Sequence, residues 1–163
     1  MKKRLLLLFT LFLLFSGCSN RKINNPYEIA KGTSVLSYYD TEDNVEIDEF
    51  DFSKSENSIE LGSPDENRIV IIDGKIRCIY IADDEIVTYN QISVGDKIDK
   101  IENSFQYEYG SGTIYSVFFD GNTEENAINQ DKEDTWIEIV YHTDGSRITS
   151  IMICDVLYGR EAR

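Results

Sequence analysis

The sequence predicts an α+β domain in which a short helix packs on an antiparallel sheet. Three observations favour this fold class: an apolar hairpin around residue 74, a second hairpin around residue 145, and one amphipathic stretch between them. Runs of β-branched residues around turn residues are typical of strands, whereas apolar residues spaced by three and four are typical of helices. Because the hairpin recurs, the sequence leaves open a degenerate tandem repeat of helix-plus-meander units, with half-repeats at about 32–90 and 91–163.

The strand predictions follow the chain in order. Residues 34–39, 45–52 and 58–61 have weaker strand patterns between charged turns. Residues 69–72 and 76–81 flank Asp73-Gly74, which is typical of a type I′ hairpin turn because glycine accepts a positive φ. Residues 114–119 form a further strand, and 120–134 read as a polar, acidic loop. Residues 136–141 and 148–155 form the second hairpin around Asp144-Gly145.

The predicted helix covers residues 95–105. Val94, Ile98, Ile101 and Phe105 recur at spacings of four, three and four, which would place them on one helical face. Ser93, with Asp96 three residues later, approximates a capping box. A helix this short must pack on the sheet to persist.

The amino terminus has the three-part order of a secretory signal. Met1–Arg4 is basic, residues 5–15 are apolar apart from Thr10, and Ser16-Gly17 places two small residues before Cys18. An apolar run of about eleven residues is too short to span a bilayer. We therefore expect residues 1–17 to be removed as a signal peptide.

Leu14-Phe15-Ser16-Gly17-Cys18 resembles the lipobox of bacterial lipoproteins, with Phe15 in place of the usual aliphatic residue. The resemblance implies that Cys18 receives a diacylglycerol and further acylation, palmitate included, that holds the mature chain on a membrane. The expected location is the outside of the cell membrane, or the outer membrane if the source has two. Residues 18–31 would form a lipidated start and a tether, and the alternative is an ordinary signal with a chance cysteine.

Composition narrows the range of partners. The chain has 16 Lys and Arg against 30 Asp and Glu, and loss of residues 1–17 removes three basic residues and no acids, which leaves a net charge of −17. Such a surface repels nucleic acid and anionic lipid, so we expect no nucleic-acid binding. It suits a basic partner, a polycationic wall component or simple solubility. Residues 32–163 have the length of a single domain.

The segment Ile92-Ser93-Val94-Gly95-Asp96, followed by apolar residues at Ile98, Ile101 and Phe105, resembles a sequence motif. The motif belongs to proteins with the beta-lactamase-inhibitor-protein-like fold. That group includes small outer-membrane assembly lipoproteins. The closing stretch 144–151 is also similar to the group's last strand. The resemblance covers about residues 69–156 and implies a helical segment followed by an antiparallel sheet, often in tandem. Members bind proteins or assemble envelope complexes, and no binding residue of the group transfers to a matching position here.

No constellation for catalysis, a cofactor or a metal is visible. His142 is the only histidine, and a hairpin around Asp144-Gly145 would place it far from Cys154. Residues 40–51 alternate acids like a calcium loop, but Val45 stands where the sharp turn requires glycine. Cys78 and Cys154 either form a disulfide in an exported protein or remain small buried hydrophobes.

These observations favour a membrane-anchored, non-enzymatic interaction module. The expected contact surface includes the hairpin tip, Asp144, Gly145, Ser146 and Arg147, and the loop 120–134. One alternative is an envelope assembly or structural lipoprotein. Another is a hydrolase of the cell wall or of glycans, which would require two carboxylates that face each other in a cleft.

Overall fold

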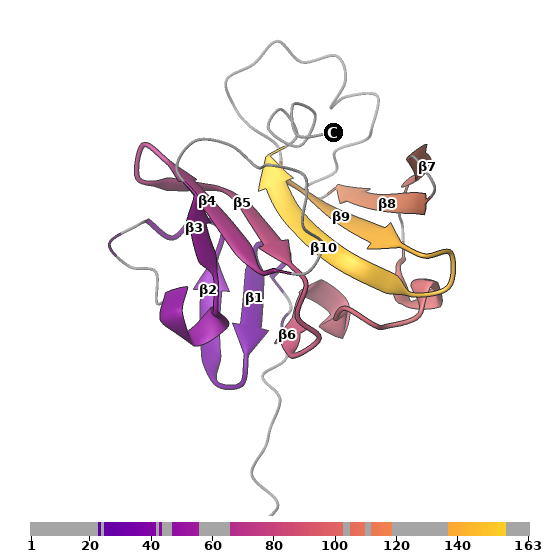
Figure 1. The fold of residues 1–163 in the computed structure, drawn as a ribbon, viewed down its shortest axis with the longest axis horizontal. Coiled ribbons are helices and arrows are strands. Elements are labelled where there is room, and N and C mark those ends of the chain that lie inside the picture. The colour runs from indigo at the N-terminus through magenta and orange to yellow at the C-terminus, as the bar shows by residue number, and fades with distance from the viewer. Residues whose placement is uncertain are drawn as a thin grey trace, which may run out of the picture.

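The part of the chain that the structure describes is built from two β-sheets (Figure 1). The computed structural model describes residues 23, 25–41, 43, 47–55, 66–102, 105–109, 112–118 and 137–155. These residues are 54% strand and 11% helical, and no helix in them reaches seven residues. The strands are β1 (Glu28–Lys31), β2 (Ser34–Ser37), β3 (Ser53–Ser55), β4 (Arg68–Ile72), β5 (Lys75–Ile81), β6 (Ile86–Val87), β7 (Phe105–Tyr109), β8 (Gly112–Phe118), β9 (Ile137–Thr143) and β10 (Ile148–Asp155).

The larger sheet has seven strands in the order β3-β4-β5-β10-β9-β8-β7. Every neighbouring pair is antiparallel except β3 and β4, which run parallel. The turn between β4 and β5 has φ angles of 52° at Asp73 and 70° at Gly74. Positive φ at both central residues is the requirement of a type I′ turn, so the predicted hairpin is confirmed.

The two hairpins lie side by side in the middle of this sheet, joined through β5 and β10. Ile81 pairs with Ile151, and Ile79 pairs with Ile153. These two pairs exchange places when the hairpins are interchanged, so an approximate two-fold axis passes between Tyr80 and Met152. The centre of the sheet is occupied by β10, the last strand among the residues that the structure describes.

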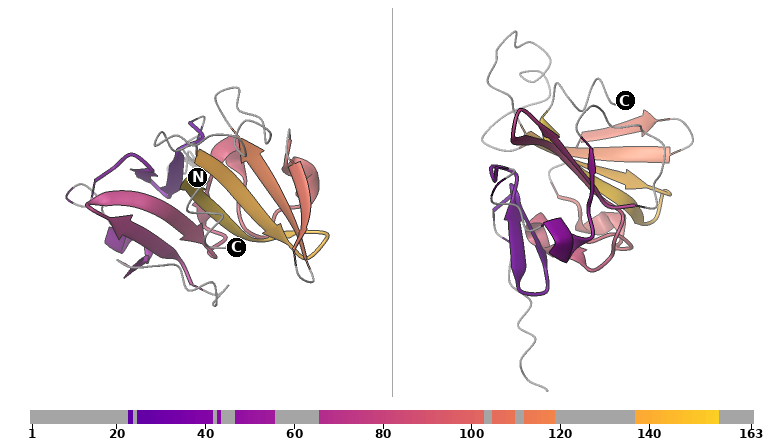
Figure 2. Two further views of the ribbon diagram at one scale, coloured as in Figure 1. Left: turned by 90° about the horizontal axis from the view of Figure 1, so that it is seen from above. Right: turned by 60° about the vertical axis from the view of Figure 1, so that its left-hand side comes forward.

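The smaller sheet has the order β2-β1-β6 and covers one face of the larger sheet (Figure 2). Buried residues of both sheets form one apolar core, to which β1, β2 and β6 contribute Ile29, Leu36 and Ile86. The larger sheet supplies alternate residues of its central strands, because side chains of a strand point to opposite faces in turn. Those residues include Ile69, Ile79, Ile81, Ile139, Tyr141, Ile151 and Ile153.

The opposite face of the larger sheet carries a second, smaller cluster of buried residues. It consists of Val70, Cys78, Ile114, Val140, Met152 and Cys154. Central strands that are buried on both faces read as continuous apolar runs rather than as an alternation. This explains why residues 69–72 and 151–153 are uniformly apolar.

The predicted helix at 95–105 is wrong, and with it the α+β class and the helix-plus-meander unit that the family resemblance implied. A three-residue 3₁₀ turn, η4 (Ile98–Lys100), is the helical part of this stretch, and β7 begins at Phe105. Gly95 has a φ of +86°, which a right-handed helix does not tolerate.

Competition for backbone hydrogen bonds gives the physical reason. The Gly95 N–H donates to the Ile148 carbonyl at 2.8 Å, and the Ile148 N–H donates to the Asp96 carbonyl at 2.9 Å. The Ile98 N–H donates to Ser146 at 3.2 Å. These groups pair with the second hairpin instead of along a helix. Val94 and Ile101 still pack against the core. The apolar spacing therefore indicates which residues contact the core, although the backbone is not helical.

The remaining strand predictions have mixed outcomes. β8 and β9 confirm the strands predicted at 114–119 and 136–141, while the strand predicted at 34–39 is confirmed only as far as Ser37. The strand at 45–52 is wrong, because Ile47–Phe50 forms the 3₁₀ turn η2. β1 occupies the last four residues of the stretch expected to be a tether. Residues 58–61 and the loop 120–134 lie outside the described residues.

The core packing yields a first prediction. Ile79 lies fully buried in β5, so Ile79→Ala removes apolar contacts with the main core and leaves a cavity. We expect a loss of about 3 kcal/mol in the free energy of unfolding, measured by urea denaturation. Ile72→Ala, at the half-buried end of β4, is the matched control and should cost about 1 kcal/mol or less. Equal losses in the two variants would contradict this account of the core.

Candidate functional site

The tip of the second hairpin packs against the segment that follows β6. Besides the backbone bonds described above, the Arg147 guanidinium donates to the Gly95 carbonyl, and Lys97 forms an isolated bridge with Arg147. The structure therefore brings together two stretches that the sequence singled out separately, 92–96 and 144–147. Together they form one end of the molecule.

Asp144 organises the turn at this tip. Its Oδ1 accepts hydrogen bonds from the N–H groups of Ser146 and Arg147, both at 2.8 Å, and from the Ser146 hydroxyl at 2.9 Å. These bonds hold the pKa of the Asp144 carboxyl below its ordinary value. All four residues of the tip, Asp144, Gly145, Ser146 and Arg147, are exposed. The tip contacts the segment after β6 through the hydrogen bonds of Ser146 and Arg147 described above. The contact role predicted for these four residues stays a prediction.

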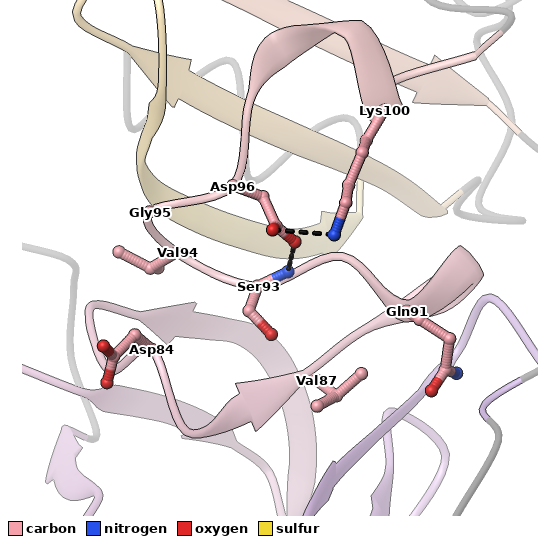
Figure 3. Close-up of a pocket in the computed structure, with 8 residues that line it drawn as sticks. All are labelled: Asp84, Val87, Gln91, Ser93, Val94, Gly95, Asp96 and Lys100. Carbon is pink, nitrogen blue, oxygen red and sulfur yellow. Dashed lines mark hydrogen bonds and ion pairs between the residues drawn. The ribbon is translucent and has the colours of Figure 1, made fainter. Parts of the chain in front are cut away.

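An open pocket of about 440 Å³ lies beside this tip (Figure 3). Its walls come from the turn before β6, from β6 itself, and from the segment that runs to η4. Most of the lining is polar. The residues that line it are Asp84, Val87, Gln91, Ser93, Val94, Gly95, Asp96 and Lys100.

Both carboxylate oxygens of Asp96 accept hydrogen bonds. Oδ2 accepts the Ser93 N–H at 2.9 Å, and Oδ1 accepts the Lys100 ammonium at 2.7 Å (Figure 3). The bond to Ser93 is half of the capping box that the sequence predicted, formed at a turn rather than at a helix. Asp84 is exposed on the other side of the pocket, and no charged partner of its carboxylate is found in the described part of the chain.

Two consecutive residues at the pocket rim have a left-handed backbone conformation. Asn90 and Gln91, in the 3₁₀ turn η3 (Tyr89–Gln91), have φ angles of 58° and 61°. Left-handed conformation is common for asparagine and rare for glutamine, so the surroundings must enforce it. Thr88 does so by donating to the Ile92 carbonyl from both its N–H and its hydroxyl, each at 2.8 Å.

Gln91 connects the pocket to the amino-terminal segment. Its side-chain amide donates to the Ile23 carbonyl at 3.4 Å, and Ile23 is only 2% exposed. The chain is therefore held on the pocket rim five residues after Cys18. Sequence reasoning missed Gln91, Thr88 and Asp84, because a left-handed glutamine and a buried threonine leave no periodic signal in a sequence.

A second charged cluster lies at the end of β1. Lys31 Nζ is 2.7 Å from Asp83 and 3.6 Å from both Asp51 and Glu85. Asn67 fixes the chain beside it, since its Oδ1 accepts the N–H groups of Ala82 and Asp83 at 2.9 and 3.1 Å. The ammonium group thus occupies the centre of the acidic cluster.

The Lys31–Asp83 pair shifts the pKa values of both partners. The hydrogen bond to Asp83 raises the pKa of Lys31, against a lowering by burial. Partial burial favours the neutral form of Asp83, but hydrogen bonds from Lys31 and from the Glu85 N–H outweigh it and lower the pKa of Asp83. The pair is a structural ion pair between β1 and the turn before β6.

The cysteines and the histidine lie in the larger sheet. Cys78 and Cys154 face each other across β5 and β10, and neither belongs to a disulfide in the structure. His142 pairs in register with Ser150, whereas Cys154 pairs with Glu138, four residues away along β9. Among the described residues, no three His, Cys, Asp or Glu side chains are grouped so that they could hold a metal ion.

The search for relatives gave no result: no protein-family model, curated protein or solved structure matches the chain. In the ranges given above, no helix is long and apolar enough to cross a membrane.

The Lys31–Asp83 pair yields a prediction on pH. A carboxyl whose pKa is lowered by folding contributes stability above its ordinary pKa of about 4, and this contribution is lost as the pH falls through the lower folded value. We expect Asp83→Asn to reduce the free energy of unfolding by about 1–2 kcal/mol at pH 7, with the difference shrinking below pH 4. The measurement is urea denaturation at a series of pH values.

Asp51→Asn is the matched control for this series. Its carboxylate is 83% exposed and 3.6 Å from the same ammonium, so the variant should change stability by less than about 0.5 kcal/mol. Asparagine also accepts the positive φ of 53° at this position. A loss for Asp83→Asn that stayed constant down to pH 2 would show that the ion pair is not its cause.

Proposed function

We propose that the protein is a lipoprotein anchored outside the cytoplasm through Cys18, and that its domain binds a basic segment of a protein partner next to the membrane. The observation that carries the proposal is the hydrogen bond from the side chain of Gln91, which lines the pocket, to the carbonyl of Ile23. The signal-like start and the lipobox resemblance support the anchor. The pocket supports the binding role.

The length of the link supports a pocket close to the membrane. Five residue steps separate Cys18 from Ile23. A fully extended chain spans at most about 3.6 Å per residue, so Ile23 lies within about 18 Å of the lipidated residue. Because the Gln91 side chain donates to the Ile23 carbonyl, the pocket rim lies only about one side-chain length farther from the bilayer surface.

Charge supports a basic partner. The mature chain carries a net charge of −17, and the pocket presents the exposed Asp84 across from the paired Asp96 and Lys100. Asp99 and Glu102 are exposed further along the same segment. A segment rich in Lys and Arg would gain from this field both in rate of association and in specificity. Val87 and Val94 add apolar contact at the pocket walls.

The pocket geometry favours binding over the hydrolase alternative. A two-carboxylate hydrolase needs one carboxyl that holds a proton for the leaving group and a second that is available to water or substrate. Asp96 accepts one hydrogen bond from the Ser93 N–H and one from the Lys100 ammonium, and these occupy both of its oxygens. It is suited to hold the pocket wall in place.

The proposed position of the pocket close to the membrane predicts how strongly labels at different sites are quenched by a quencher in the bilayer. We expect a fluorophore on Asp84→Cys to be quenched strongly by a quencher at the lipid headgroups when the lipidated protein is bound to vesicles. The matched control is Lys75→Cys, at the exposed turn of the first hairpin, which should be quenched less. Cys78 and Cys154 are fully buried and should escape labelling. Equal quenching at both positions would rule out the proposed orientation, and loss of vesicle binding in Cys18→Ala tests the anchor itself.

The proposed partner class predicts a charge effect at one site. We expect a fluorescent octalysine peptide to bind the lipoprotein, and Asp84→Lys to weaken that binding several-fold at low salt because the substitution reverses the charge at the pocket. Asp43→Lys makes the same change in net charge at an exposed residue that does not line the pocket, close to Thr41, which bridges Lys75 at the turn of the first hairpin, and it should have a smaller effect. Fluorescence anisotropy measures both. Equal weakening by the two variants would show that only net charge matters, and would contradict a pocket-centred site.

A further inference from the structure

Cys78 and Cys154 occupy directly opposed positions on adjacent strands. They are Cα partners in the antiparallel pairing of β5 with β10, at the end of a continuous register that starts at Ile81 and Ile151. Opposed residues of an antiparallel pair point to the same face of the sheet, with Cα atoms about 4.5 or 5.5 Å apart. Disulfides have Cα separations of about 4.4–6.8 Å, so the position suits a bond without movement of the backbone.

The surroundings of the two thiols are apolar and closed. Both side chains are fully buried, and they share one cluster with Val70, Val140 and Met152. Oxidants in solution therefore reach the sulfur atoms only before the sheet closes or when the end of β10 opens. A bond formed there would be shielded from reductants in the same way.

We propose that Cys78 and Cys154 form a cross-strand disulfide in the mature protein, which fastens the last strand to the first hairpin. The sequence alone left this pairing open, because nothing in it made β5 and β10 neighbours. The inference rests on the proposed export for its oxidising compartment, whereas the geometry is independent of it. The bond closes a loop that contains both β6 and the meander of β7 to β9.

The chemistry is thiol–disulfide exchange with a disulfide oxidant of the compartment, either the active-site disulfide of a thiol oxidase or a small disulfide such as oxidised glutathione. One cysteine loses its proton, attacks a sulfur of the oxidant and forms a mixed disulfide, which releases one thiol. The second cysteine loses its proton and attacks the protein sulfur of that mixed disulfide. This step forms the Sγ–Sγ bond and releases the second thiol. Two electrons and two protons pass to the oxidant, which becomes two thiols.

The test counts thiols in the full chain. Cells are quenched with acid, and the protein is unfolded and alkylated with a polyethylene-glycol maleimide, with or without prior reduction by dithiothreitol. Acylated Cys18 is a thioether and does not react. We expect no additions without reduction and two after it. One extra addition in both samples would show that Cys18 carries no lipid, which contradicts the proposed function and leaves the disulfide standing.

A second measurement tests whether the strand geometry alone allows the disulfide to form, independently of the compartment in which the protein resides. The purified lipoprotein is reduced, unfolded and refolded in detergent with oxidised glutathione. We expect an intramolecular disulfide and a rise in Tm on the order of 10 °C over the reduced protein. The double variant Cys78→Ala/Cys154→Ala should show a Tm that does not respond to dithiothreitol. Two reactive thiols in cells, even with a disulfide on refolding, would contradict the bond in the mature protein, whereas failure to form the bond on refolding would show that the geometry itself does not suit it.

Discussion

Strands β5 and β10 meet in the middle of the larger sheet, and their antiparallel pairing joins the first half of the chain to the second. One face of this pair supplies Ile79, Ile81, Ile151 and Ile153 to the main core, and the other face carries Cys78, Met152 and Cys154. The smaller sheet packs on the first of these faces. Removal of this pairing would divide the larger sheet into a three-stranded part, β3-β4-β5, and a four-stranded part, β10-β9-β8-β7, and would separate the residues that the two parts supply to the common core.

The same pairing determines how the pocket is made. Because β10 is central, its hairpin with β9 projects a tip that meets the segment after β6, and backbone groups of that segment bond to Ile148 and Ser146. The segment therefore runs as an extended chain with turns, stiffened by Asp96 against Ser93 and Lys100. The tip supports the pocket wall from behind, while Thr88 and Gln91 shape its rim. The site is a product of tertiary contacts between distant stretches of sequence.

This origin explains which features the sequence could predict. Both central hairpins were recognisable, because Asp-Gly turns and β-branched runs act locally, and Asp73-Gly74 has the backbone that its residue types imply. The helix prediction was wrong, because Val94 and Ile101 pack partly against the core while Gly95 turns the chain with a positive φ. Burial periodicity is a property of the core surface that a segment meets, and it does not specify the backbone when another strand offers hydrogen-bond partners. The pocket was invisible for the same reason, although Ser93 and Asp96 were identified as interacting residues.

The position of β10 also has a consequence for the order of events in biogenesis. Partners in the central ladder are separated by 70 residues at Ile81 and Ile151 and by 76 at Cys78 and Cys154. Contacts of such long range form late and slowly, because the loop entropy must be lost before the contacts can compensate for it. The sheet has no centre until the carboxy-terminal strand arrives, so a chain threaded amino terminus first through a translocation channel cannot complete its core on the way. For the exported lipoprotein proposed above, such late closure would leave the chain unfolded during its passage through the channel.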